Sequence, residues 1–165
     1  MRAKRVVAVL VAGLVAGAVS AGCSPAASRA DGATALHSIL NRVDTAASAV
    51  ATTRLVLTQR SAGRLPAVTA DAALGHAVES TTRAVHDIAT IVIPGAPAVV
   101  QTARAQALSA AAAAVASVAH ARIFLGGRDG SAAERQTLSA LGDATRALRQ
   151  ASAAIKRAAK AETAS

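Results

Sequence analysis

Apolar residues recur in steps of three and four within four separate stretches of the sequence, and this periodicity constrains the fold more than any other feature. Such steps place side chains on one side of an α-helix, so each stretch predicts a helix with a single apolar stripe. The predicted helices cover residues 33–60, 69–92, 97–125 and 131–161. The first stripe is the most regular, and its members are Leu36, Ile39, Val43, Ala46, Val50, Thr53 and Leu57.

The other three stripes mix branched aliphatic residues with Ala, Thr and Ser. In residues 69–92 the expected stripe is Leu74, Val78, Thr81, Val85, Ile88 and Val92. In residues 97–125 it is Leu108, Ala111, Val115, Val118 and Leu125. In residues 131–161 it is Leu138, Leu141, Thr145, Leu148, Ser152, Ile155 and Ala159. Since many of these side chains are small, we expect a thin core in which the helices must approach closely.

Short segments that contain Gly or Pro separate the four stretches, at residues 61–66, 93–97 and 126–130. Thr69 is expected to cap the second helix, because its hydroxyl would accept a hydrogen bond from a free backbone N–H. Pro97 suits the first position of the third helix, where no N–H is needed. Ser131 and Glu134 have the spacing of a capping box for the fourth helix. The short connections predict that consecutive helices are antiparallel.

The composition favours a wholly helical domain. Of the 165 residues, the 143 that follow residue 22 include 42 Ala, and Phe124 is the only aromatic residue. Ala has the highest helix propensity, whereas sheets favour β-branched and aromatic side chains. We therefore predict an all-α fold, an up-down-up-down four-helix bundle over residues 33–162 with both of its ends on the same side.

The first 22 residues have the pattern of an export signal. Arg2, Lys4 and Arg5 give a basic start, and residues 6–19 contain only Val, Ala, Leu and Gly. As a helix these 14 residues would span about 21 Å, which is short for a bilayer core of about 30 Å. Because basic residues stay on the cytoplasmic side, the remainder of the chain is expected outside the membrane.

Small residues and the only cysteine of the chain follow this segment, in the order Ser20-Ala21-Gly22-Cys23. They resemble the lipobox of bacterial lipoproteins, and the resemblance implies cleavage after Gly22 and a diacylglycerol thioether on Cys23. Lipidation would also account for an unpaired cysteine in an exported protein. Ser20 departs from the family, which has Leu or another branched aliphatic residue there. Ordinary secretion after Val19-Ser20-Ala21 and an uncleaved anchor therefore remain open.

The sequence thus divides into a signal segment, residues 1–22, a tether, residues 23–32, and the bundle. The tether is expected to be flexible because its residues are small and polar. The preference for Arg over Lys and the abundance of Ala indicate a high-GC bacterium such as an actinobacterium. The resemblance to lipoproteins covers only the signal segment and Cys23, and it implies a location on the outer side of the cell membrane.

The first candidates for metal binding or acid–base chemistry are the histidines, namely His37, His76, His86 and His120. In an antiparallel bundle they are separated along the axis by about 9 to 15 Å, whereas zinc needs its ligands about 2 Å away. His86 and Asp87 are neighbours in sequence and point in different directions on a helix. Asp143 lies within one turn of Arg146, which predicts a surface ion pair. We therefore expect no catalytic residue, metal site or cofactor.

The charge of the domain points to an anionic partner. Without Arg2, Lys4 and Arg5, the 18 basic residues fall to 15, against 9 acidic ones. Nucleic acid is not expected, because the chain is exported and lacks aromatic residues for stacking. Anionic lipid headgroups or wall polymers fit better. The predicted topology brings Lys156, Arg157 and Lys160 back towards Cys23 as a membrane-surface contact, although cations there would also complement the helix dipole.

These features lead to three functional hypotheses. The first is a lipid-anchored envelope protein that acts without catalysis, as an interaction or structural module with a protein partner, a membrane or a wall polymer. The second is a carrier that binds an apolar ligand within the bundle, since a core rich in Ala leaves room for one. The third is an enzyme whose site is assembled across helices. The first hypothesis predicts an exposed apolar strip or a basic face.

Overall fold

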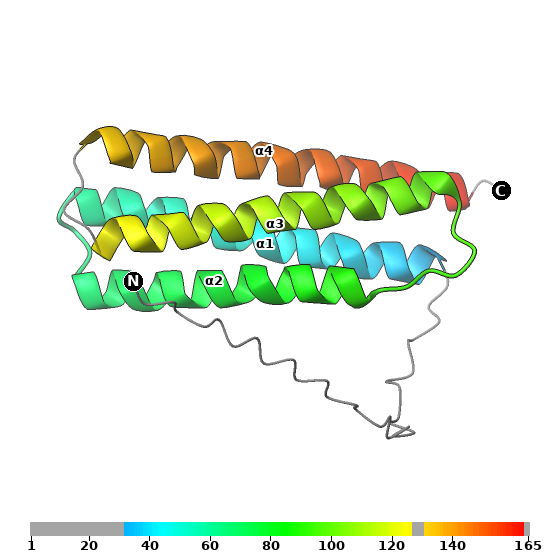
Figure 1. The fold of residues 1–165 in the computed structure, drawn as a ribbon, viewed down its shortest axis with the longest axis horizontal. Helices are drawn as coiled ribbons and strands as arrows, with labels where there is room; N and C mark the ends of the chain where they lie inside the picture. The colour runs from blue at the N-terminus through cyan, green and yellow to red at the C-terminus, as the bar shows by residue number, and fades with distance from the viewer. Residues whose placement is uncertain (1–31, 127–130, 164–165) are drawn as a thin grey trace, which may run out of the picture.

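The computed structural model describes residues 32–126 and 131–163. This part of the chain forms four helices, α1 (Gly32–Ser61), α2 (Ala67–Thr90), α3 (Ala98–Gly126) and α4 (Ser131–Glu162) (Figure 1). The described residues contain no strand, so the predicted all-α fold is confirmed. Each helix begins and ends within two residues of its predicted bounds. The predicted signal segment, Cys23 and the tether up to residue 31 lie outside the described residues.

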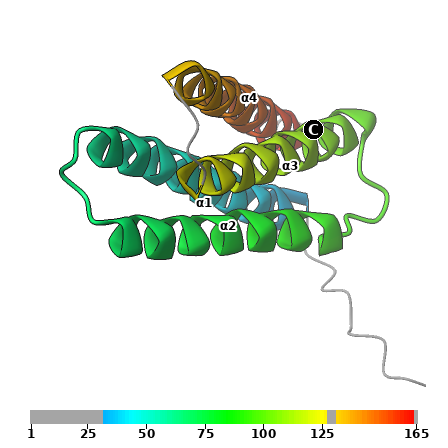
Figure 2. The same ribbon diagram turned by 60° about the vertical axis from the view of Figure 1, so that its left-hand side comes forward.

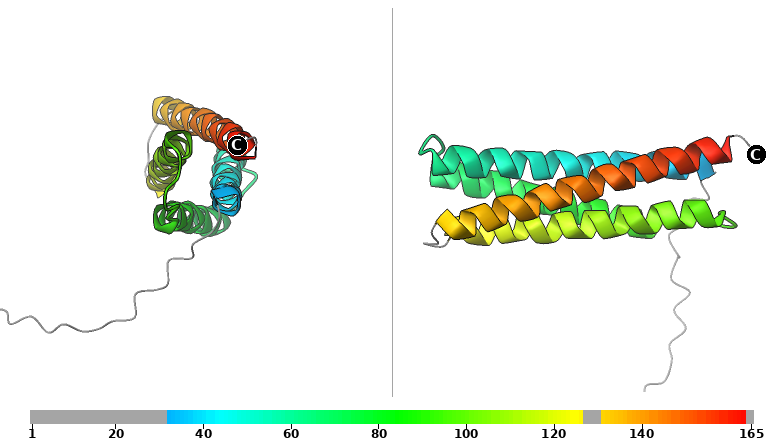
Figure 3. Two further views of the ribbon diagram at one scale, coloured as in Figure 1. Left: turned by 90° about the vertical axis from the view of Figure 1, so that its right-hand side faces the viewer. Right: turned by 90° about the horizontal axis from the view of Figure 1, so that it is seen from above.

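The helices form an up-down-up-down bundle in which each one contacts its two neighbours (Figures 2 and 3). The diagonal pair α1 and α3 also come into contact, whereas α2 and α4 do not within the described residues. The end of α4 lies beside the start of α1 (Figure 3). A Cβ on Gly32 would clash with the Glu162 carboxylate. This proximity confirms that both ends of the bundle lie together.

The core combines a few large aliphatic side chains with many alanines. All seven residues of the stripe predicted for α1 are buried. The large members of the core that are fully buried include Leu36, Ile39, Leu57, Leu74, Ile88, Leu141, Leu148 and Ile155. On α3 the buried residues are mostly alanines, and Ala107, Ala111 and Ala114 have no exposed surface. Side chains this small allow the helix backbones to approach closely, and this approach fills the interior.

The stripes predicted for α2, α3 and α4 were partly wrong. Val78 and Val85 are half-buried, and Val92 is 53% exposed. Other predicted members are also half-buried, namely Leu108, Val115, Leu125, Leu138, Thr145, Ser152 and Ala159. Smaller residues that were not predicted point to the axis, namely Ala77, Ala84, Ala103, Ala107, Ala144 and Ala151. Where the helices are closest the buried positions suit Ala, so these alanines share the core with Leu74, Ile88, Leu141, Leu148 and Ile155.

Three threonines, Thr53, Thr81 and Thr137, are the polar residues that the described part of the chain buries fully. Each hydroxyl donates a hydrogen bond of 2.9 Å to the carbonyl oxygen four residues earlier in its own helix. Their hydrogen-bonding needs are therefore met within the helix, and no unpaired hydroxyl is left in the core.

The helix starts differ in detail from the predictions. Thr69 does not cap α2, because Pro66 is the capping residue and no side chain caps this end. The fixed φ of −61° at Pro66 allows its carbonyl oxygen to accept a hydrogen bond from the Ala70 N–H at 3.0 Å. Pro97 lies one residue before α3, and its carbonyl oxygen accepts the first hydrogen bonds of that helix. Glu134 accepts a hydrogen bond from Ser61, which links α4 to α1, and the Ser131 side chain lies outside the described residues.

Candidate functional site

The exposed side of α4 carries a long row of basic side chains. Six exposed cations belong to it, namely Arg135, Arg146, Arg149, Lys156, Arg157 and Lys160. Most are separated by 3, 7 or 11 residues, which are close to whole turns of a helix, so they share one side of α4. From Arg135 to Lys160 the row is about 37 Å long at 1.5 Å per residue. We refer to these six residues as the cationic face.

Acidic residues neutralise little of the cationic face. Within it, Asp143 forms an ion pair of 3.0 Å with Arg146, as the sequence predicted. Glu134 is engaged with Ser61 at one end of α4. At the other end Glu162 lies against Gly32. Among the described residues no ion pair involves the other five cations, so the cationic face carries a surplus of positive charge.

The three cations that the sequence analysis selected, Lys156, Arg157 and Lys160, are exposed and lie in the last turns of α4. The contact between Gly32 and Glu162 places these turns beside the start of α1. Arg135, Arg146 and Arg149 belong to the same surface but were not predicted as members of it. Their spacing of whole helical turns from Lys156 was the signal that could have found them.

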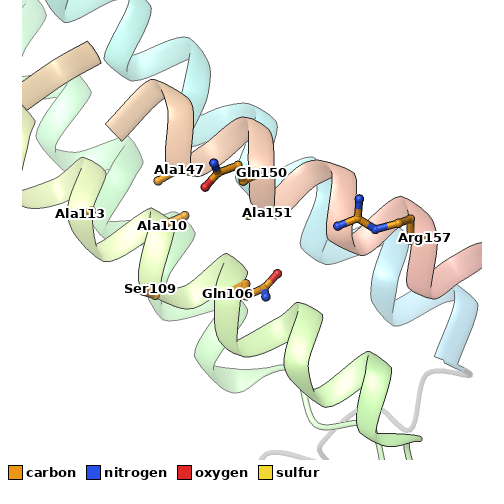
Figure 4. A pocket seen from close by; sticks show the side chains of 8 residues that line it. All are labelled: Gln106, Ser109, Ala110, Ala113, Ala147, Gln150, Ala151 and Arg157. Carbon is orange, nitrogen blue, oxygen red and sulfur yellow. The ribbon is translucent and has the colours of Figure 1, made fainter. Parts of the chain in front are cut away.

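A surface groove of about 500 Å³ runs between α3 and α4. Figure 4 shows Gln106 projecting from α3, and Gln150 and Arg157 from α4, beside the groove. The other lining residues are Ser109, Ala110, Ala113, Ala147 and Ala151. A second groove of about 280 Å³ shares Gln106 and Arg157 and continues along the same seam. The lining amides, hydroxyl and guanidinium can hold a polar or anionic group, but Arg157 is the single ionisable side chain among them.

The candidate catalytic and metal-ligating residues are dispersed. All four histidines are exposed, namely His37, His76, His86 and His120. Asp87 forms an ion pair of 3.1 Å with Arg42 of α1. Within residues 32–126 and 131–163, no three His, Cys, Asp or Glu side chains are placed to hold a metal ion.

Helix α3 is also unusual in composition. Its segment Ala98–Leu125 is long and apolar enough to cross a membrane by length and composition alone. The helix nevertheless packs against α1, α2 and α4, and a core helix rich in Ala has the same composition. Large apolar side chains are exposed on several elements rather than along one helix, namely Leu55 on α1, Val68 on α2, Val92 in the turn after α2, and Val99 and Ile123 on α3. The basic face of α4 is therefore the more continuous surface feature.

No protein-family model, curated protein or solved structure matches this chain. The fold alone does not select a function, because four-helix bundles serve many different chemistries. Function therefore has to follow from the residues of this chain and from their arrangement.

Proposed function

We propose that this protein is a lipid-anchored component of a bacterial envelope that acts without catalysis, as a module that binds an anionic surface through α4. The surplus of positive charge on the cationic face is the observation that carries this proposal. The expected partner is the anionic headgroup layer of the membrane to which the lipid on Cys23 attaches the chain. The protein is accordingly exported and faces the extracytoplasmic side.

The anchor and the cationic face would have separate roles. A diacylglycerol group on Cys23 keeps the chain at the membrane, since each buried CH₂ contributes about 0.8 kcal/mol. By itself it would not fix the orientation of the bundle, because the residues before Gly32 have the small, polar composition of a linker. Each basic residue near an anionic surface adds about 1 kcal/mol. The six cations of α4 would therefore hold the bundle with its α4 side on the headgroups.

Catalysis and ligand transport have less support. General acid–base chemistry requires titratable side chains that meet in a cleft, and the groove between α3 and α4 is lined by one ionisable residue, Arg157. The groove between α1 and α2 likewise contains a single titratable side chain, His76. A carrier for an apolar ligand would need a cavity inside the bundle. The grooves described above lie along the seams between helices, on the outside.

The anchor is tested by mass spectrometry of the protein isolated from cells that make the full chain. The proposal expects a mature N-terminus at Cys23 with a mass increase that corresponds to a diacylglycerol thioether. A mature N-terminus at Gly22, or an unmodified Cys23, would contradict lipidation and leave simple secretion.

Surface binding is tested by co-sedimentation of the chain from Ser24 onward with vesicles that contain anionic phosphatidylglycerol. The variant with Lys156→Gln, Arg157→Gln and Lys160→Gln should bind at least tenfold more weakly, since three contacts of about 1 kcal/mol are lost. The control variant with Arg54→Gln, Arg60→Gln and Arg64→Gln has the same net charge, and its binding should change less than threefold. Equal weakening of both variants would show that net charge alone acts. If the protein bound tightly to isolated wall polymer but not to vesicles, the partner would be the wall polymer and not the membrane.

A further inference from the structure

The two grooves between α3 and α4 join at a pair of polar side chains. Gln106 of α3 and Arg157 of α4 line both the groove of about 500 Å³ and its continuation of about 280 Å³. Figure 4 shows the Gln106 amide and the Arg157 guanidinium extending from opposite helices into the same stretch of the seam. We refer to the two grooves together as the seam groove.

The rims of the seam groove carry hydrogen-bonding groups that the protein does not use. Gln106, Ser109 and Thr102 belong to α3, and Gln150 belongs to α4. All four side chains are exposed. Within the part of the chain that the structure describes, none of them forms a hydrogen bond with the protein. Amides and hydroxyls both donate and accept, so these groups can bind a ligand that does the same.

The floor of the seam groove is made of alanines. Ala110 and Ala151 are 5% and 2% exposed beneath the larger groove, and Ala103 is 2% exposed beneath the smaller one. Their methyl groups leave space between the helices that a longer side chain would fill. A short hydrocarbon segment of a ligand can lie on this floor while its polar groups reach the rims.

Arg157 gives the seam groove one positive charge. It forms no ion pair among the described residues, and no carboxylate lines either groove. A single guanidinium suits a ligand with a single negative charge, and its geometry matches two oxygens of a phosphate group. The seam groove therefore fits a phosphodiester whose substituent is short and hydroxylated.

We propose that the seam groove selects the headgroup of phosphatidylglycerol, a phosphodiester lipid with two free hydroxyls. Arg157 would bind the phosphate oxygens, and the Gln106 and Gln150 amides would bind the glycerol hydroxyls. This inference rests on the proposed attachment of α4 to the membrane. It adds a preference among anionic lipids, which charge alone does not give, because headgroups of equal charge attract a basic surface alike.

The first test compares vesicles of phosphatidylglycerol with vesicles of phosphatidylpropanol, by co-sedimentation with the chain from Ser24 onward. Phosphatidylpropanol has the same phosphodiester charge and a headgroup of the same carbon count, but no headgroup hydroxyl. At equal mole fraction, binding to phosphatidylglycerol should be about tenfold tighter, since two hydrogen bonds depend on the hydroxyls. Equal binding to both lipids would overturn this inference and leave the proposed function intact.

A double variant tests the two amides. Gln106→Ala with Gln150→Ala leaves the charge unchanged, and the fold should persist because both side chains are exposed. The preference for phosphatidylglycerol should fall below about twofold, while binding to phosphatidylpropanol stays the same. The control Gln136→Ala is exposed on α4 and lies outside both grooves, so it should keep the full preference. A double variant that also keeps it would exclude the two amides as the selecting groups.

A monomeric lipid separates this inference from the attachment to membranes. Dihexanoyl phosphatidylglycerol is titrated below its micelle concentration and followed by ¹H–¹⁵N NMR of the glutamine side-chain amides. The Gln106 and Gln150 signals should shift saturably, with a dissociation constant in the millimolar range, and the Gln136 signal should not. Such shifts without binding to vesicles would support the seam groove and contradict the proposed function. Unmoved signals, or shifts caused only by isolated wall polymer, would overturn the lipid as the ligand.

Discussion

Helices α3 and α4 pack side by side, yet their exposed surfaces differ in chemistry. α3 contains two charged residues, Arg104 and Arg122, whereas α4 contains nine. Their buried sides are similar, since both turn alanines and a few branched aliphatic residues towards the core. Packing therefore constrains one side of each helix and leaves the other side free to vary. Any difference in function between the two helices must come from the exposed sides.

The seam between the two helices shows how little polar contact this packing requires. Ser117 of α3 donates a long hydrogen bond, 3.4 Å, to the carbonyl oxygen of Ala140 in α4. No ion pair joins α3 to α4 within the described residues. The close approach of small side chains holds the pair together, so core substitutions should affect stability more than surface charges do.

The largest loss of stability is expected when a buried side chain of α4 is shortened. Leu148 is 1% exposed, and Leu148→Ala should lower the free energy of unfolding by about 2–5 kcal/mol because it leaves a cavity. The adjacent Arg149 is exposed, and Arg149→Ala should stay within about 0.5 kcal/mol of the wild type. Urea denaturation followed by circular dichroism measures both. Similar values for the two variants would contradict the assigned orientation of α4.

The next largest loss of stability is expected when a buried alanine of α3 is replaced by a larger side chain. Ala114 has no exposed surface, and Ala114→Leu should destabilise the bundle by about 1–3 kcal/mol because the helices cannot separate freely. Ala112 is exposed, and Leu has almost the same helix propensity as Ala. Ala112→Leu should therefore change stability by less than about 0.5 kcal/mol. If Ala114→Leu were neutral in the same urea experiment, the core would contain unfilled space beside α3.

A charge added to α3 should extend the basic surface of α4. Ala113 is exposed and lines the groove beside α4, so Ala113→Lys should strengthen binding to anionic vesicles by up to about fivefold, or 1 kcal/mol. Ala72 is exposed on α2, which does not contact α4. Ala72→Lys adds the same charge and should have a smaller effect. An equal gain from both substitutions would indicate that the surface of contact is not centred on α4.

The smallest effects are expected from the ion pairs of the two helices. Arg122 of α3 pairs with Asp71 of α2 at 3.1 Å, and Arg146 of α4 pairs with Asp143 at 3.0 Å. The four side chains are between 47% and 71% exposed, so double-mutant cycles should give coupling energies of about 0–1 kcal/mol for each pair. A coupling above about 2 kcal/mol would mean that the pair is shielded from water in solution.

The sequence predicted α1 better than the other helices, for a physical reason. In α1 the large residues Leu36, Ile39 and Leu57 recur at the buried positions, so periodicity locates the core side directly. In α3 alanines occupy every side, and periodicity cannot tell the buried Ala114 from the exposed Ala112. Val85 and Val92 were assigned to the core because they continue the steps of three and four that define the stripe of residues 69–92. Val85 is half-buried and Val92 lies in the turn after α2, whereas the buried side of α2 combines Leu74 and Ile88 with smaller residues such as Ala77 and Ala84.

The candidate sites also differ in how far the sequence predicted them. The helical spacing of the basic residues is present in the sequence, and the position of Lys156, Arg157 and Lys160 beside the start of α1 followed from a count of antiparallel helices. The hydrogen bond from the Arg104 side chain to the carbonyl oxygen of Ala89, fifteen residues earlier, was not predictable from the sequence. That contact depends on how α2 and α3 come together.

By itself the sequence determined the number of helices, their approximate bounds and their antiparallel order, because these depend on local propensity, periodicity and short connections. It also placed a lipobox-like Cys23 before the bundle. Only the tertiary structure decided which alanines form the core, which helices meet across the diagonal, and that the Arg104 side chain reaches the carbonyl oxygen of Ala89. These properties arise from the distances between helices, and an alanine-rich sequence is compatible with many such distances until all four helices pack together.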